Sequence, residues 1–119
     1  MPATRDAHNP RVLPRIGGLR LRELLVLILV RSTAPMTVAA LVTAVGGRGF
    51  RIEGRAGKVV SDQLRYEVAR GRVHRVARGV YGAGTVTRQA RWRMQRRITG
   101  LQIGGQEATL VDADDVLSL

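Results

Sequence analysis

The chain has 119 residues and no cysteine, which excludes a disulfide framework and a thiolate metal site and favours a cytoplasmic protein with one domain and a tail. Twenty Lys and Arg residues against nine Asp and Glu residues give a net charge of +11, the electrostatic footprint of a protein that binds a polyanion. The densest apolar run, residues 24–30, is far shorter than the about 20 residues of a membrane span, so no membrane partner is expected.

The charge is unevenly distributed along the chain. Residues 1–97 hold all twenty basic residues and five of the nine acidic ones, a net charge of +15, whereas residues 98–119 hold four acidic residues and no basic one. The acidic residues of this tail are Glu107, Asp112, Asp114 and Asp115. Their clustering is weaker than that of a Ca²⁺ loop, so we expect a solvated acidic patch and no metal.

The first helix is predicted after an irregular N-terminus. Residues 1–17 contain three of the four prolines and no periodicity, and we expect a flexible segment. Residues 19–32 are typical of a helix with Leu, Val and Ile around most of its circumference, which predicts the central element of the core. Pro35 ends this helix because it disfavours helical conformation at Ala34.

A second, short helix is predicted next, with Thr37 as its N-cap and Gly46 and Gly47 as its stop. Its apolar stripe consists of Val38, Leu41, Val42 and Val45. The connector that follows, residues 46–57, is rich in Gly and Arg but lacks the glycine and hydroxyl spacing of a nucleotide-binding loop. The two candidate core residues of the connector are Phe50 and Ile52.

A third helix fits residues 56–70, where Val60, Leu64 and Val68 form a narrow stripe and Gly71 follows as the stop. The opposite arc carries Lys58, Val59, Asp62, Arg65, Tyr66, Ala69 and Arg70. A basic hairpin is then predicted, with a turn over residues 77–79, because a short loop that ends in Gly separates two Val-containing runs. We expect Tyr81 to pack against the core and His74 to be a surface residue.

A last helix is predicted over residues 85–98. Its apolar stripe consists of Val86, Ala90, Met94 and Ile98. Its other faces carry Arg88, Arg91, Trp92, Arg93, Arg96 and Arg97. A large exposed aromatic residue usually marks an interface, so Trp92, between Arg88 and Arg96, is the candidate contact for the acidic tail or a second subunit. Residues 100–119 are expected as an acidic tail or a small hairpin.

The predicted order of helix, helix, Gly-rich connector, helix and hairpin resembles a winged helix-turn-helix domain. The segments that carry the resemblance are TVAALVTAV, GKVVSDQLRYEVARG and RVHRVARGVYGAG. The hairpin is also similar to the wing of AbiEi-type antitoxin N-terminal domains, and the third helix to segments of small actinobacterial regulators. The expected fold class is therefore mainly α with a small β-hairpin: a winged helix-turn-helix domain over residues 18–84, a basic C-terminal helix over 85–99 and an acidic tail.

The resemblance implies binding to double-stranded DNA, with the third helix in the major groove and the wing on phosphates or in the minor groove. The expected DNA contacts are Lys58, Ser61, Asp62, Arg65, Tyr66, Arg70, Arg72, Arg75 and Arg78. Arg65 is the best candidate for a bidentate contact to guanine, and Asp62 either orients Arg65 or accepts from cytosine. Arg75 and Arg78 are placed on the wing.

No catalytic set of residues and no cofactor motif is present, so the sequence predicts a non-enzyme, a transcriptional regulator or a nucleoid-associated protein. Two alternatives stay open. The Arg-Gly dipeptides suggest an RNA-binding module, and the acidic tail with the Trp92 helix suggests an antitoxin-like or regulatory subunit that binds another protein. A homodimer is also open.

Overall fold

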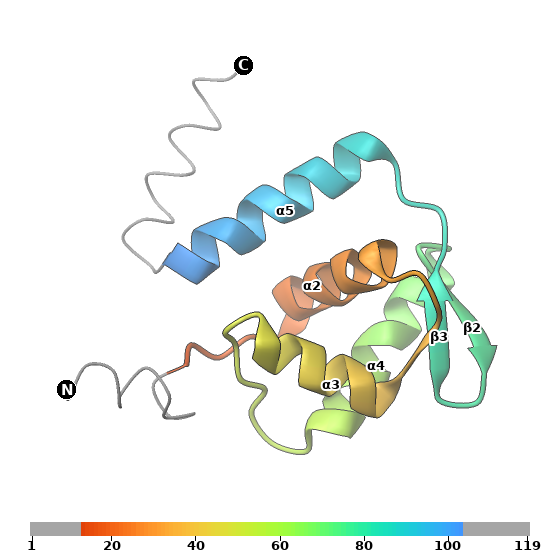
Figure 1. Cartoon of the computed structure of the whole chain (residues 1–119), viewed down its shortest axis with the longest axis horizontal. Coiled ribbons are helices and arrows are strands. Elements are labelled where there is room, and N and C mark those ends of the chain that lie inside the picture. Colours follow the sequence, from red (N-terminus) through yellow and green to blue (C-terminus); the bar gives the residue numbers. More distant parts are fainter. Residues whose placement is uncertain (1–12, 104–119) are drawn as a thin grey trace.

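The computed structural model describes residues 13–103 and has the architecture shown in Figure 1. The elements in chain order are α2 (Gly18–Arg31), β1 (Met36–Thr37), α3 (Val38–Gly47), α4 (Ala56–Ala69), β2 (Val73–Ala77), β3 (Val80–Ala83) and α5 (Arg88–Ile103). The described part is mainly helical with a small antiparallel sheet, as predicted. None of its helices is long and apolar enough to cross a membrane.

Helix α2 lies at the centre of the core. Leu21 and every side chain from Leu24 to Leu29 are buried. Helices α3 and α4 contact α2 on one side and α5 contacts it on the other (Figure 1). A helix that is apolar around most of its circumference needs such neighbours on several sides, so the prediction that this helix is the central core element is confirmed.

Helix α3 begins at the predicted N-cap. The Oγ1 atom of Thr37 accepts a hydrogen bond from the Ala40 backbone N at 3.1 Å, which satisfies one of the free amides of the first turn. The helix ends slightly later than predicted, because Gly46 and Gly47 both belong to it and Arg48 is its C-cap.

The sheet has three strands instead of the two predicted. Strand β1 pairs antiparallel with β3, so that the strand order is β1-β3-β2. Met36 lies opposite Tyr81, and the Val38 backbone N donates to the Gly79 carbonyl oxygen at 3.1 Å. A strand of two residues is too short to produce an alternating sequence pattern. Strand β1 joins the start of α3 to the hairpin.

The irregular alternation of the hairpin has a structural cause. Between Arg75 and Ala77, strand β2 contains one residue more than β3, a β-bulge. The extra residue, Val76, is exposed although it is apolar. The turn consists of Arg78 and Gly79, one residue shorter than predicted, and Gly79 adopts a φ of +72°, a region that favours glycine.

A narrow neck closes the base of the hairpin. The Gly84 backbone N donates to the Arg72 carbonyl oxygen at 2.8 Å, and Thr85 N donates to the Gly71 oxygen at 2.9 Å. A Cβ atom on Gly84 would lie only 2.3 Å from that Gly71 oxygen and 2.8 Å from the Arg72 carbonyl carbon. Both atoms belong to the backbone, so only glycine fits at this position.

Two further predicted boundaries are wrong. The N-terminal segment was expected to be flexible up to residue 17, but Ile16 is buried and its backbone N donates to the Arg51 oxygen at 3.0 Å. Helix α5 was expected over 85–98 but begins at Arg88, where Thr87 Oγ1 accepts from Ala90 N, and continues to Ile103. Residues 100–103, expected in the tail, are therefore helical; residues 1–12 and 104–119, with most of the expected acidic tail, lie outside the described part.

Side chains predicted to be in the core join the outer elements to α2. The core cluster contains Phe50 of the connector and, from α5, Met94 and Ile98; Val86 and Ile52 pack against it. These contacts confirm the apolar positions predicted for the connector and, in the stripe of the last helix, those of Val86, Met94 and Ile98; the fourth, Ala90, is half-buried.

A buried carboxylate also joins α5 to α2. Glu23 of α2 accepts hydrogen bonds from Arg97 of α5, with Arg97 Nε 3.0 Å from Glu23 Oε2, and from Arg20. Burial alone would raise the pKa of Glu23, but hydrogen bonds from Arg97 and Arg20 and their positive charges outweigh burial and lower it below its usual 4.5. Glu23 therefore stabilises the fold in its charged form.

Glu23→Gln should destabilise the protein at neutral pH and make it less sensitive to acid. Because the pKa of Glu23 is lowered in the folded protein, the stability that this group contributes is present above pH 4.5 and is lost as the pH falls below 4.5 through the folded-state pKa. Thermal unfolding of both proteins from pH 7 to pH 3 should show the gap between them narrowing in acid. A constant gap would contradict this role, and Glu53→Gln, at an exposed carboxylate, is the control with the smaller effect.

Gly84→Ala should lower the free energy of unfolding by about 1–3 kcal/mol, the usual cost of forcing extra atoms into a packed site. The backbone of the neck must separate to accept the methyl group. Gly46→Ala, in α3 where an added Cβ meets nothing within 4 Å, is the matched control and should be neutral or stabilising. Urea unfolding measures both variants; equal stability would show that the neck yields easily.

Candidate nucleic-acid interface

Helix α4 packs on α2 and α3 along one edge. Val60 and Leu64 are buried as predicted, but the third member of the predicted stripe, Val68, is exposed, and Glu67 is buried in its place. Positions seven and eight residues after Val60 flank the same line on a helix of 3.6 residues per turn. Glu67 takes the buried position because its carboxylate has a cationic partner there.

That partner is Arg72, which follows the end of α4. Gly71 has a φ of +78° and its N donates to the Val68 oxygen, while Arg72 N donates to the Glu67 oxygen, the two bonds of a Schellman motif. This reversal brings the Arg72 guanidinium onto the Glu67 carboxylate in a bidentate pair, Nε–Oε1 at 2.6 Å and Nη2–Oε2 at 3.0 Å. The two side chains are only 20% and 1% exposed. Arg72, expected as a DNA contact, is therefore committed to a structural ion pair.

The outward face of α4 carries charged side chains that lie close together. Lys58 Nζ lies 3.2 Å from Asp62 Oδ2, and Arg65 Nη2 lies 3.8 Å from Asp62 Oδ1. Arg65 is 81% exposed, so its guanidinium extends from the helix while Asp62 limits its direction. Ser61 lies at the half-buried edge of this face, and Arg70 is exposed at its end.

An arginine that the sequence did not indicate extends this face. The guanidinium carbon of Arg22, on α2, lies 4.5 Å from the centre of the Tyr66 ring in a cation–π contact. Tyr66 is otherwise exposed. No sequence pattern relates these positions, because the contact depends on how α2 crosses α4. A hollow of about 620 Å³ lies beside the ring and is lined by Lys58, Asp62, Gln63, Arg65, Tyr66 and Ala69.

The hairpin adds exposed cations beside α4. Arg75 and Arg78 are exposed, and β2 contacts α4. Tyr81 is half-buried and packs against the core, as predicted. We use the name α4–hairpin surface for the exposed or half-exposed residues Lys58, Asp62, Arg65, Tyr66, Arg70, Arg75 and Arg78.

The predicted interface residues of the last helix lie elsewhere. Trp92 is 49% exposed, and the guanidinium carbon of Arg96 lies 4.9 Å from the centre of its ring. Arg88 is exposed on the same helix. Because α5 and α4 contact different sides of α2 (Figure 1), these residues do not join the α4–hairpin surface.

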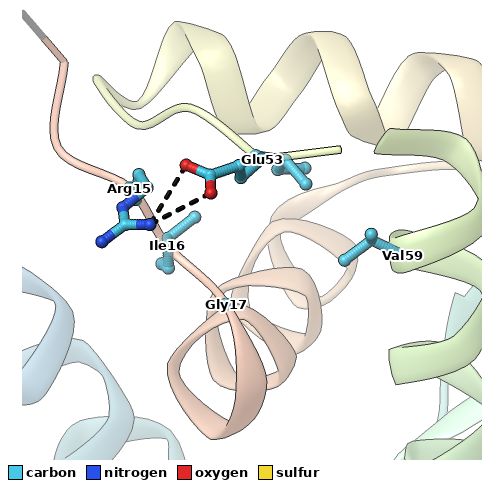
Figure 2. A pocket seen from close by; sticks show the side chains of 6 residues that line it. Arg15, Ile16, Gly17, Glu53 and Val59 are labelled. Carbon is cyan, nitrogen blue, oxygen red and sulfur yellow. Dashed lines mark hydrogen bonds and ion pairs between the residues drawn. The ribbon is translucent and has the colours of Figure 1, made fainter. Parts of the chain in front are cut away.

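A second hollow, of about 520 Å³, lies between the N-terminal segment, the connector and α4 (Figure 2). Its lining residues are Arg15, Ile16, Gly17, Ile52, Glu53 and Val59. At its rim Arg15 Nη1 lies 3.1 Å from both carboxylate oxygens of Glu53, and Arg51 donates to Glu53 at 3.3 Å. Hydrogen bonds from Arg15 and then Arg51 lower the pKa of Glu53. The charges at this hollow are thus paired with one another.

The chain matches no protein-family model, no curated protein and no solved structure. Residues 13–103 contain no group of three or more His, Asp or Glu side chains that could hold a metal ion. The chemistry of the α4–hairpin surface is therefore the guide to function.

Arg72→Met should destabilise the protein by about 3–5 kcal/mol, because it leaves the buried Glu67 carboxylate without its counter-charge. Arg70→Met, at the exposed neighbour, should change stability by less than about 0.5 kcal/mol and is the matched control. The double variant Glu67→Leu with Arg72→Met should recover most of the loss. Urea unfolding tests all three, and equal effects of Arg70→Met and Arg72→Met would contradict the assigned role.

Proposed function

We propose that the protein binds double-stranded DNA as a winged helix-turn-helix domain, with α4 in the major groove and the β2–β3 hairpin as the wing. The observation that carries the proposal is the α4–hairpin surface, which places exposed cations of a helix and of an adjacent hairpin on one continuous unit. The order of elements supports it, since helix, helix, connector, helix and hairpin is the order that resembles this class. Strand β1 joins the hairpin to the first helix of the motif.

The shape of α4 suits the major groove. Its 14 residues correspond to a helix about 21 Å long, and the groove, about 12 Å wide, admits a helix. Because α4 packs along the edge of Val60, Leu64 and Glu67, its opposite arc is free to enter the groove. Arg65 extends from that arc, and its fork of donors matches the O6 and N7 acceptors of guanine.

The wing suits the phosphate backbone. Arg75 and Arg78 are exposed on a short hairpin whose base is fixed to the end of α4 by the Glu67–Arg72 pair. A fixed base keeps the two arginines at a constant position relative to α4. Contacts of this kind position a protein on DNA and carry no sequence information directly.

Duplex DNA fits this surface better than single-stranded nucleic acid. Single-strand binders stack successive bases on neighbouring aromatic side chains. The four aromatic residues of this chain lie on four separate elements: Phe50 on the connector, Tyr66 on α4, Tyr81 on β3 and Trp92 on α5. Phe50 is buried and Tyr81 is half-buried, so these residues do not form a stacking platform.

Removal of an arginine from α4 and removal of one from the hairpin should have different effects on DNA affinity. Arg78→Ala should weaken binding to all duplexes alike and reduce the salt slope by about one unit, as loss of one phosphate contact does. Arg65→Ala should cost roughly 1–3 kcal/mol on a preferred site and little on random DNA, because a base contact provides discrimination. Affinities are measured by salt titration on both duplexes, with the preferred site taken from selection among genomic fragments.

The control is Arg91→Ala, which removes the same charge from α5 on the other side of α2 and should leave both affinities nearly unchanged. Equal losses on both duplexes for Arg65→Ala would favour an architectural, nucleoid-associated role over a sequence-specific regulator. Tighter binding of single-stranded RNA than of duplex DNA in competition, or no loss from either variant, would refute the proposed function.

A further inference from the structure

We infer that the acidic segment 106–119 packs in cis on the outer face of α5, where its apolar side chains cover Trp92 and its carboxylates neutralise the exposed arginines. This outer face is defined by Arg88, Trp92 and Arg93, which are all exposed. The inference goes beyond DNA binding and does not depend on it.

The outer face combines a high positive charge with an exposed indole. The 16 residues of α5 contain no acidic residue and five arginines, of which Arg97 pairs with Glu23 of α2. The opposite side of the helix is used by Met94 and Ile98 in the core. A half-exposed indole beside exposed arginines offers a partner both apolar contact and positive charge, which suits this face to a contact site.

The positive charge of this face and the indole of Trp92 together decide which kind of partner can bind there. A second copy of α5 would bring arginines against arginines, and like charges oppose association. A duplex would neutralise the arginines but offers no apolar group to the Trp92 ring, because its bases are stacked on one another. The occupant that fits both properties is a peptide that is acidic and apolar at once.

Segment 106–119 has this composition. It holds four acidic residues and no basic residue, and its apolar side chains include Leu110, Val111, Val116 and Leu117. It follows α5 after Gly104 and Gly105, and glycines permit a reversal of the chain. Trp92 lies about 16 Å along the helix axis from Ile103, whereas the nine residues from there to Asp112 span up to about 30 Å. A covalent link also gives the segment an effective concentration in the millimolar range.

Docking of this segment would cover one of the two basic surfaces of the protein, the outer face of α5. The outer face of α5 lies on the other side of α2 from the α4–hairpin surface. A segment bound there leaves the α4–hairpin surface open and keeps the arginines of α5 from non-specific polyanions.

The fluorescence of Trp92, the one tryptophan of the chain, tests the docking without any DNA. The emission of the full chain should be blue-shifted and should not depend on protein concentration. Truncation after Gly105, which retains every described residue, should shift the emission to the red. A triple variant of Asp112, Asp114 and Asp115 to Asn should give a smaller red shift, whereas Arg75→Gln on the hairpin should give none. Circular dichroism checks the helix content of each protein.

Identical emission of the full and truncated chains would overturn the inference. A blue shift that disappears on dilution would also overturn it, since the contact would then be between two copies. No shift in the Asn variant would overturn the ion pairing. In a separate experiment at low salt, truncation should tighten binding to random duplex DNA, because four opposing charges are removed from a basic protein. Absence of binding by both proteins would count against the proposed function and not against the docking.

Discussion

Burial of α2 on every side is the constraint on which the arrangement of the other elements depends. Each buried Leu, Ile or Val side chain contributes about 1.5–3 kcal/mol, and α2 provides an unbroken run of them from Leu24 to Leu29. No single neighbour can cover such a helix. Helices α3 and α4 cover one side and α5 the other, so the polar faces of α4 and α5 point away from each other. The high positive charge of the chain is consequently divided between two surfaces.

Two buried glutamates fix the positions of these elements relative to one another through ion pairs. Glu23 joins α5 to α2 through Arg97, and Glu67 joins the hairpin to α4 through Arg72. A hydrophobic contact tolerates some sliding, whereas a bidentate ion pair in a buried site fixes direction as well as distance. Both acids also leave the solvent-accessible surface. Each acid is neutralised by its arginine partner, so the two pairs leave the net positive charge of the exposed surface unchanged.

The features that could be predicted from the sequence are those that depend on a local pattern of residues. Periodicity located the helices, Thr37 marked a helix start, and a Gly-ended loop marked the hairpin. Features that depend on three-dimensional approach were not predictable. The burial of Glu67 in place of Val68 required knowledge of where Arg72 would lie, and strand β1 was too short to show alternation. For the candidate site, the exposed Arg65, Arg75 and Arg78 were predicted, but the Arg22 contact with Tyr66 was not, since it arises where two helices cross.

The hairpin is held at its base by the neck at Gly84 and at its turn by the hydrogen bond from Val38 N to the Gly79 oxygen. Its base is constrained by backbone atoms that exclude any side chain, whereas Val76, Arg78 and the rest of the tip touch solvent. Because the hairpin is attached at both ends, replacing the exposed side chains between the two attachments does not alter the angle at which it leaves α4. The hairpin is thus a platform of fixed geometry: substitution of Val76 or Arg78 can change the charge and shape of its tip while the helical body, and the fit of α2 within it, stay as they are.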